Sequence, residues 1–119
     1  MITLRRVYDP EKTGEGYKVL VDRLWPRGFS KEKAVWHEWA KEVSPSNELR
    51  KWYSHDPSKW DEFRQKYRKE LSGKKGEMER LKQLENEYGT LTLLYSSKEE
   101  KYNNAVALRE FLMQLDEQP

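Results

Sequence analysis

The sequence contains no cysteine, and this absence removes several classes of protein at once. A disulfide framework, a zinc–thiolate site and a cysteine nucleophile are all excluded. The two histidines, His37 and His55, are too few and too badly spaced for a convincing metal cage. We therefore expect no metal site.

Long apolar runs are also missing. No stretch approaches the roughly 18 consecutive apolar residues that a membrane span requires, so no membrane partner is expected. The first residues, Met1 to Arg6, are not followed by the apolar region of a secretory signal. These two observations predict a cytoplasmic protein.

The chain has no large excess of charge of one sign. Its 23 Lys and Arg residues nearly balance its 21 Asp and Glu residues, whereas nucleic-acid-binding proteins usually carry a dense basic face. Nucleotide fingerprints are absent as well, because Gly14 and Gly16 lack the third glycine and the following helix of a dinucleotide loop. No cofactor is indicated, and the sequence does not indicate an oligomeric state.

Aromatic residues are what the chain has in quantity. Five Trp, seven Tyr and three Phe accompany a low overall apolar content of 35%. Disordered chains are poor in aromatics, and each large ring buries about 150–250 Å². The 119 residues are therefore expected to fold as a single domain, residues 1–119.

Three segments have the composition of β-strands, namely residues 2–7, 17–22 and 90–95. The last two have apolar centres, and a long helical excursion separates them, as in a parallel crossover connection. The sequence therefore predicts an α/β fold with a small, mainly parallel sheet of three to four strands. Helices are expected to cover both faces of this sheet.

Apolar residues at helical spacing predict the helices. One helix is expected around residues 36–43, with His37 on its surface. Ser46 is expected to cap a short helix that runs to Tyr53, and Asp56 followed by Pro57 is expected to begin the next one. The residues that share predicted helix faces are Trp36, Trp39, Ala40 and Val43; Trp60, Phe63, Tyr67 and Leu71; Met78, Leu81, Leu84 and Tyr88 (before a Gly89 cap); and Leu108, Phe111, Leu112 and Leu115.

The densest group of chemically useful residues follows the second strand. In open parallel sheets ligands bind beyond the carboxyl ends of the strands, and here Asp22, Arg23, Trp25 and Arg27 lie beside Pro26 and Gly28. Asp22 is a candidate base or positioning group, Arg23 and Arg27 are candidate anion ligands, and Trp25 is a candidate stacking surface. Arg27 is expected to face a concave surface shared with residues 95–104. The alternative is an Asp–Arg pair that fixes a turn, with Trp25 in the core.

A second group surrounds the end of the short helix. His55 is a candidate general acid or base because imidazole titrates near neutrality, and Trp52 is a candidate stacking residue. Asp56 could orient His55, but its role as a helix cap is the favoured interpretation.

A third group follows the last strand. Ser96 and Asn104 are candidate ligand-binding residues, since the amino end of a helix attracts anions. The favoured interpretation of this segment is a capping box formed by Ser97 and Glu100, with a later helix start near Asn103 as the alternative.

Together these segments resemble the YeaO-like proteins of the DUF 488 family. The segments that carry the resemblance are residues 17–28, 44–52, 55–57 with Trp60, 91–96 and 103–105. The resemblance implies a single-domain bacterial or archaeal α/β protein and brings no established reaction. Relatives often carry His at the position of Asn104, so a family role for that His is not available to this chain.

The main hypothesis is a site for an anionic or nucleotide-like small molecule, with Asp22 and His55 as candidate catalytic residues. Arg23, Trp25, Arg27, Trp52, Ser96 and Asn104 are the candidate ligand-binding residues. The alternative is a nucleic-acid or protein interaction module that uses exposed Arg and Trp side chains without catalysis.

Overall fold

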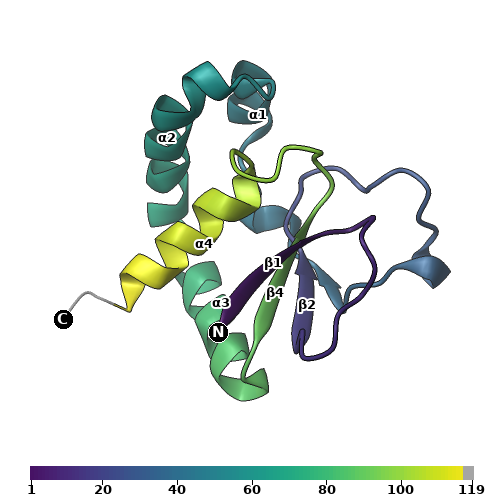
Figure 1. The fold of residues 1–119 in the computed structure, drawn as a ribbon. Helices are drawn as coiled ribbons and strands as arrows, with labels where there is room; N and C mark the ends of the chain where they lie inside the picture. The colour runs from purple at the N-terminus through teal and green to yellow at the C-terminus, as the bar shows by residue number, and fades with distance from the viewer. Residues whose placement is uncertain (117–119) are drawn as a thin grey trace.

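A computed structural model, which describes residues 1–116, contains one four-stranded sheet and four α-helices (Figure 1). The strands are β1 (Ile2–Arg6), β2 (Tyr17–Leu20), β3 (Glu38–Trp39) and β4 (Leu91–Tyr95), in the spatial order β1-β4-β2-β3. Every neighbouring pair is parallel, which confirms the predicted class of fold. The three predicted strands agree with the observed ones to within two residues at each end.

Strand β4 is the centre of the sheet. It pairs with β1 from Ile2↔Leu91 to Arg6↔Tyr95 and with β2 from Tyr17↔Leu91 to Leu20↔Leu94. All five of its residues are buried, as expected for a parallel strand that is covered on both faces. The alternation of side chains sends Leu91, Leu93 and Tyr95 into the larger apolar cluster and Leu94 into a second, smaller one.

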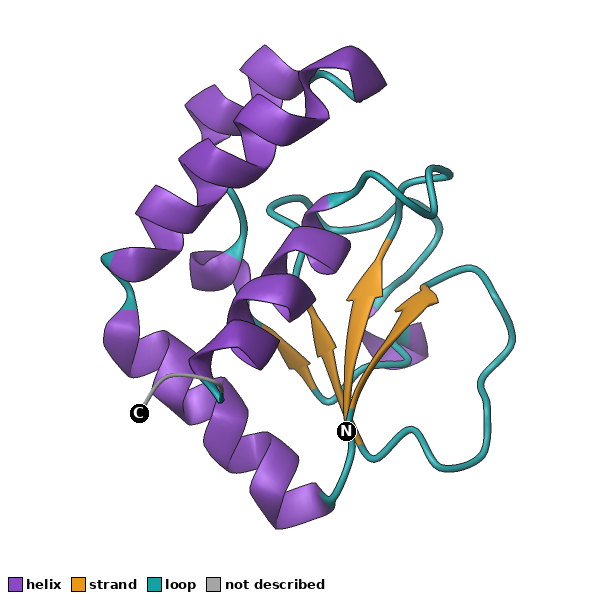
Figure 2. Ribbon diagram, turned by 60° about the vertical axis from the view of Figure 1, so that its left-hand side comes forward, coloured by secondary structure: helices purple, strands orange, loops and turns teal. Residues whose placement is uncertain are grey.

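The larger cluster lies beneath the four α-helices, which gather on one side of the strands (Figure 2). These are α1 (Asn47–Tyr53), α2 (Trp60–Ser72), α3 (Lys75–Tyr88) and α4 (Asn104–Leu115). Seven of their buried residues lie on the predicted helix faces, namely Phe63, Tyr67, Leu71, Met78, Leu81, Leu108 and Leu112, whereas Leu49, Tyr53, Ala105 and Ala107 are also buried and were not among the predicted residues. Among the aromatic residues on the predicted helix faces, Phe63 and Tyr67 are buried, Tyr88 is exposed, and the others are half-buried, namely Trp36, Trp39, Trp60 and Phe111.

The opposite face of the sheet has a different cover. Here the smaller cluster of Val7, Leu20 and Leu94 is overlaid by aromatic rings from the connection between β2 and β3. That connection contains only one turn of 3₁₀-helix, η1 (Lys31–Lys33). The prediction that helices cover this face is therefore wrong, since a loop with a single 3₁₀ turn covers it. Edge-to-face contacts such as Trp25–Trp36 (centroids 4.9 Å apart) hold this loop together.

The expected helix over residues 36–43 is wrong. Glu38 and Trp39 form β3, and Lys41–Val43 form a 3₁₀ turn, η2. Trp39 packs in the smaller cluster whereas Ala40 packs in the larger one, so neighbouring residues point to opposite faces of the sheet. The apolar residues at helical spacing belong here to an edge strand and the turn after it, whose side chains pack alternately in the two apolar clusters. His37 consequently lies on no helix, and its Nδ1 accepts a hydrogen bond from the backbone N–H of Lys18 (3.0 Å).

The predicted helix caps around α1 and α2 are confirmed. The Ser46 hydroxyl accepts a hydrogen bond from the N–H of Leu49 (3.1 Å) at the start of α1. Asp56 accepts one from the N–H of Ser58 (3.1 Å) at the 3₁₀ turn η3 (Pro57–Lys59), which leads into α2. Gly89, with φ +79°, ends α3.

A buried ion pair fixes the connection between β1 and β2 against the sheet. Arg5 and Glu15 are 3% and 8% exposed, and the Arg5 side chain also donates to the carbonyl of Asp9 (2.8 Å). At the end of this connection Gly16 has φ +63°, and a Cβ placed on it would lie 2.1 Å from the carbonyl oxygen of Thr90. Only glycine meets both requirements, because L-residues disfavour this φ and the space is filled by backbone.

Two glycine substitutions in this connection separate backbone strain from the clash. Gly14 also has positive φ (+83°), but a Cβ there would meet nothing within 4 Å. We expect Gly14→Ala to cost about 1–2 kcal/mol of unfolding free energy, and Gly16→Ala about 1–3 kcal/mol more. Urea denaturation of both variants measures the difference, and equal costs would contradict the close packing of Gly16 on Thr90.

Candidate functional site

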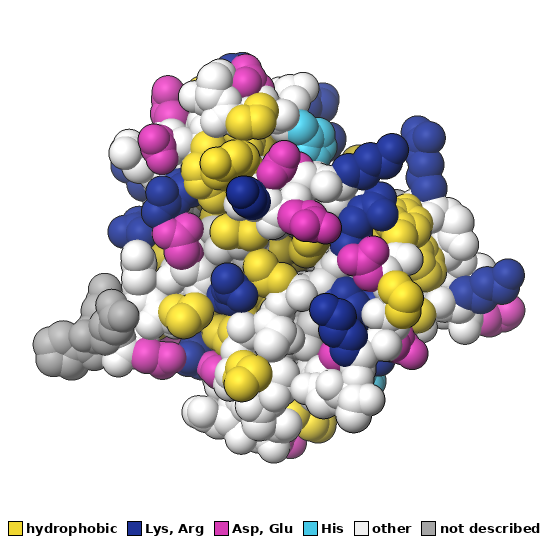
Figure 3. All heavy atoms as spheres, in the orientation of Figure 1, with side chains coloured by type: hydrophobic (Ala, Val, Ile, Leu, Met, Phe, Trp, Pro, Cys, Tyr) yellow, Lys and Arg dark blue, Asp and Glu magenta, His cyan; other side chains and the backbone are white. Residues whose placement is uncertain are grey.

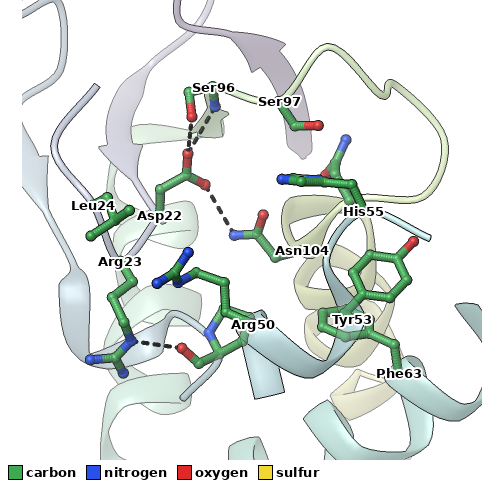
Figure 4. A pocket seen from close by; sticks show the side chains of 12 residues that line it. Asp22, Arg23, Leu24, Arg50, Tyr53, His55, Phe63, Ser96, Ser97 and Asn104 are labelled. Atoms are coloured by element: carbon green, nitrogen blue, oxygen red, sulfur yellow. Dashed lines mark hydrogen bonds between the residues drawn. The ribbon is translucent and has the colours of Figure 1, made fainter. Parts of the chain in front are cut away.

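A cavity of about 150 Å³ lies at the carboxyl ends of β2 and β4, beside the start of α4 (Figure 4). This is the place where the parallel sheet predicts a ligand site. Its lining residues are Asp22, Arg23, Leu24, Pro45, Arg50, Tyr53, His55, Phe63, Ser96, Ser97, Asn103 and Asn104. The three segments that the sequence analysis selected therefore meet at one cavity.

Asp22 joins the elements around the cavity. Its Oδ2 accepts hydrogen bonds from the backbone N–H (2.9 Å) and the hydroxyl (2.7 Å) of Ser96, which follows β4. Its Oδ1 accepts one from Nδ2 of Asn104 (3.1 Å), the first residue of α4. Asn104 Nδ2 also donates to the carbonyl of Val21 (3.1 Å). One carboxylate thus connects β2, β4 and α4, and Figure 4 shows it facing the cavity between these residues.

The start of α4 differs from the expected capping box. The helix begins at Asn104, and its N-cap is Asn103, whose Oδ1 accepts from the N–H of Val106 (3.0 Å). The Ser97 hydroxyl instead accepts from the N–H of Glu99 (3.0 Å) within the preceding loop. The favoured interpretation of Ser97 and Glu100 is therefore wrong, and the alternative of a later helix start is correct. The reason is that Asn103 is itself a strong N-cap residue.

Two arginine side chains line the cavity, and their guanidinium groups differ in their hydrogen bonds. Arg23 Nε donates to the carbonyl of Pro45 (2.8 Å), so this side chain is anchored to the segment before α1. Arg50, on α1, donates from Nη2 to Oδ1 of Asn47 (2.8 Å), but its Nε is buried and has no hydrogen-bond partner among the described residues. In Figure 4 the Arg50 guanidinium points toward the side of the cavity where Asp22 and Asn104 lie.

Arg50 was not among the residues predicted from the sequence. It lies in a short helix beside the buried residues Leu49 and Tyr53, and this position does not distinguish a residue that lines a cavity from one on the surface. Arg50 reaches the cavity because Leu49 and Tyr53 hold α1 in the larger apolar cluster beside α2.

His55 reaches the cavity through an unusual stretch of backbone. Ser54 and His55, directly after α1, have φ values of +47° and +56°, in the left-handed region that non-glycine residues rarely adopt. Asp56 is engaged as the cap of η3, with Oδ1 accepting from both the N–H and the hydroxyl of Ser58, so it does not orient His55. Within residues 1–116 the His55 imidazole has no hydrogen-bond partner, and the side chain is exposed at the cavity.

Tyr53 forms part of the cavity wall together with Phe63, on whose ring it stacks (centroids 4.4 Å apart). Its hydroxyl donates to the carbonyl of Tyr102 (2.8 Å). Burial raises the pKa of Tyr53 to about 12, with the negative charges of Glu99 and Asp56 acting in the same direction. Tyr53 therefore stays protonated at neutral pH and serves as a donor, not as a base.

Three of the predicted ligand-binding residues do not line the cavity. Trp25 belongs to the aromatic cover of the opposite face, where its Nε1 donates to the carbonyl of Phe29. Arg27 is exposed and does not share a concave surface with residues 95–104. Trp52 packs beside the larger core, with the ammonium group of Lys66 3.9 Å from its ring centroid. Asp22, Arg23, His55, Ser96 and Asn104 are the predicted residues that do meet at the cavity.

The described part of the chain, residues 1–116, contains no group of three or more side chains able to hold a metal ion. Within the same residues, no helix has the length and apolar character needed to cross a membrane. The cavity combines apolar walls from Leu24, Pro45 and Phe63 with hydrogen-bonding groups of both signs. Such a site can hold a small polar molecule by charge and shape.

The fold and this strand-end cavity are those of a small parallel α/β protein, and sequence comparisons define the class further. The family model that matches residues 1–119 is described as the inactive DUF488-N3 subclade, so the chain belongs to the DUF488 family. It is 42% identical over 114 residues to the uncharacterized protein YeaO of Escherichia coli, covering 96% of this chain and 98% of that one.

Uncharacterized proteins of Mycobacterium tuberculosis and Mycobacterium bovis are 44% identical to the chain over 70 residues, which is 59% of each sequence. No solved structure matches the chain with significance. These comparisons confirm the predicted family resemblance.

The network around Asp22 predicts a measurable loss of stability. Asp22→Ala removes the acceptor for three hydrogen bonds and should lower the free energy of unfolding by about 2–3 kcal/mol, because the Ser96 and Asn104 donors lose their partner. Asp61→Ala is the control, since Asp61 lies on the exposed face of α2, and it should leave the urea midpoint almost unchanged. Similar midpoints for the two variants would show that the network contributes nothing.

The raised pKa of Tyr53 predicts alkaline destabilisation. A tyrosine whose folded pKa exceeds its unfolded value of 10 stabilises the fold fully below pH 10 and loses that contribution as the pH rises toward 12. We expect the free energy of unfolding to fall between pH 10 and 12, and Tyr53→Phe to make that fall shallower. Urea titrations at pH 8, 10 and 11 test this, and an unchanged slope in the variant would refute it.

Proposed function

We propose that this chain is a binding protein for a small anionic molecule, which occupies the cavity at the ends of β2 and β4. The observation that carries the proposal is Arg50, whose Nε–H is buried at the cavity wall without a partner. Leaving a buried donor unsatisfied costs about 1–3 kcal/mol. An anion that lets the guanidinium reorient onto it would recover this free energy.

The charges of the cavity favour an anion over a cation. The guanidinium groups of Arg23 and Arg50 line it together with one carboxylate, Asp22, which already accepts three hydrogen bonds. The His55 side chain, which lines the same cavity, has an N–H donor of its own. Guanidinium groups bind carboxylate and phosphate groups through paired N–H donors.

The size of the cavity limits the ligand. Sites for drug-sized molecules usually measure about 300–1,000 Å³, whereas this cavity measures about 150 Å³. A phosphate group or a short carboxylic acid fits within it. A nucleotide would place its phosphate inside and leave its base outside, so the cavity supports an anionic ligand better than a whole nucleotide.

Binding without turnover fits the geometry better than catalysis. Asp56, the residue that could have oriented His55, caps η3 instead. A general acid or base has to be held in place for its substrate, and within residues 1–116 no hydrogen bond holds the His55 imidazole. The description of the matching subclade as inactive agrees with this proposal.

The alternative of an interaction module is less well supported. It required exposed indole rings, but Trp36 and Trp39 belong to no helix and all five Trp side chains are at least half-buried. On the face shown in Figure 3, Lys and Arg side chains are interspersed with Asp and Glu side chains and do not form a dense basic surface.

Titration of ¹⁵N-labelled protein with inorganic phosphate and with propionate tests the proposal. We expect the Arg50 Nε–H resonance and the Ser96 amide resonance to shift with saturation. Arg50→Met keeps the length of the side chain and removes its donors, so it should weaken binding by about tenfold or more, the equivalent of 1.5–3 kcal/mol for a hydrogen bond to a charged group.

Arg27→Met is the matched control, since Arg27 has the same charge but is exposed outside the cavity. It should bind both anions as the unmodified protein does. Equal weakening in the two variants would indicate that the anions bind through the overall charge of the protein and not at the cavity. If neither phosphate nor propionate binds, the site does not accept a simple anion.

A further inference from the structure

The carboxylate of Asp22 has an unused acceptor position at the cavity. Each carboxylate oxygen can accept about two hydrogen bonds. Within residues 1–116, Oδ2 accepts two, both from Ser96, whereas Oδ1 accepts one, from Asn104 Nδ2 at 3.1 Å. Since Asp22 lines the cavity, the remaining lone pair of Oδ1 is available to a hydrogen-bond donor on a ligand.

Asp22 and Arg50 lie on the same cavity but do not pair with each other. Among the ion pairs of residues 1–116, none joins these two side chains, although Figure 4 shows the Arg50 guanidinium pointing toward Asp22. The ends of both side chains are restrained, Asp22 by Ser96 and Asn104, and Arg50 by its hydrogen bond to Asn47. The space between these two opposite charges can hold a molecule that carries a negative group for Arg50 and a hydrogen-bond donor for Asp22.

We propose that the ligand is a small hydroxylated anion, of which a short hydroxy acid is the simplest example. Its anionic group contacts Arg50, and its hydroxyl group donates to Oδ1 of Asp22. This inference rests on the proposed function and adds the second group that the ligand must carry. A plain anion leaves the free position of Asp22 unused and brings its own negative charge toward that carboxylate, so it should bind less well.

The remaining walls agree with a short carbon skeleton. Phe63 and Pro45 are buried, and Tyr53 stacks on Phe63, so the side of the cavity formed by these residues is apolar and rigid. A two- or three-carbon chain fits against these groups within about 150 Å³. Larger molecules of the class would extend past Leu24, which is 57% exposed at the rim.

Two probes that differ by one hydroxyl group test the inference on the unmodified protein. L-lactate and propionate have the same charge and the same number of carbon atoms. We expect L-lactate to bind about tenfold more tightly, the effect of one added hydrogen bond to a charged acceptor. The side-chain amide resonances of Asn104, which donates to the same oxygen of Asp22, should shift with L-lactate and hardly at all with propionate.

The outcomes separate this inference from the proposed function. Equal affinities for L-lactate and propionate would overturn the inference and leave the anion site intact. Binding of inorganic phosphate without binding of L-lactate would also overturn it, since the hydroxyl would then contribute nothing. If phosphate, propionate and L-lactate all fail to bind, the proposed function fails and the inference fails with it.

Discussion

The carboxylate of Asp22 is the constraint on which the arrangement of the site depends. Two donors come from Ser96 after β4 and one from Asn104 at the start of α4, so one side chain sets the position of two neighbouring segments. Without it the backbone N–H of Ser96, directly after β4, would lose its hydrogen-bond partner. These donors are turned toward Asp22 at the cavity wall, and Arg50 lines the same cavity without an ion-pair partner within residues 1–116.

The sheet and most helices could be predicted because their signals are local. Strand β4 is a continuous apolar run, and the Ser46 and Asp56 caps hold their helices through side chains close in sequence. The segment 36–43 could not be predicted in this way. Its spacing fits a helix, but its residues divide between two apolar clusters that exist only once the sheet has formed. Long-range packing overrides local pattern at such positions.

Part of the candidate site could also be predicted from the sequence. The rule that parallel strands end at a common edge placed Asp22, Arg23, Ser96 and Asn104 together, and the structure brings them to one cavity. The same rule also selected Trp25 and Arg27, which do not line the cavity, because the chain turns away after Leu24 and Trp25 packs on Trp36 and Trp39 over the opposite face. It also missed Arg50, because the packing of α1 against α2 and the larger apolar cluster decides which of its side chains face the cavity, and no short-range pattern contains that information.

The strand order has a consequence for the emergence of the chain from the ribosome. Strand β4, near the end of the sequence, lies between β1 and β2, and among the described residues it is the only strand that pairs with β1. Strands β1 and β2 therefore lack the strand that lies between them until residue 95 has been synthesised and has left the ribosome. During that interval the helices between Asn47 and Tyr88 are the parts that can form through local contacts, and the sheet closes last around its middle strand.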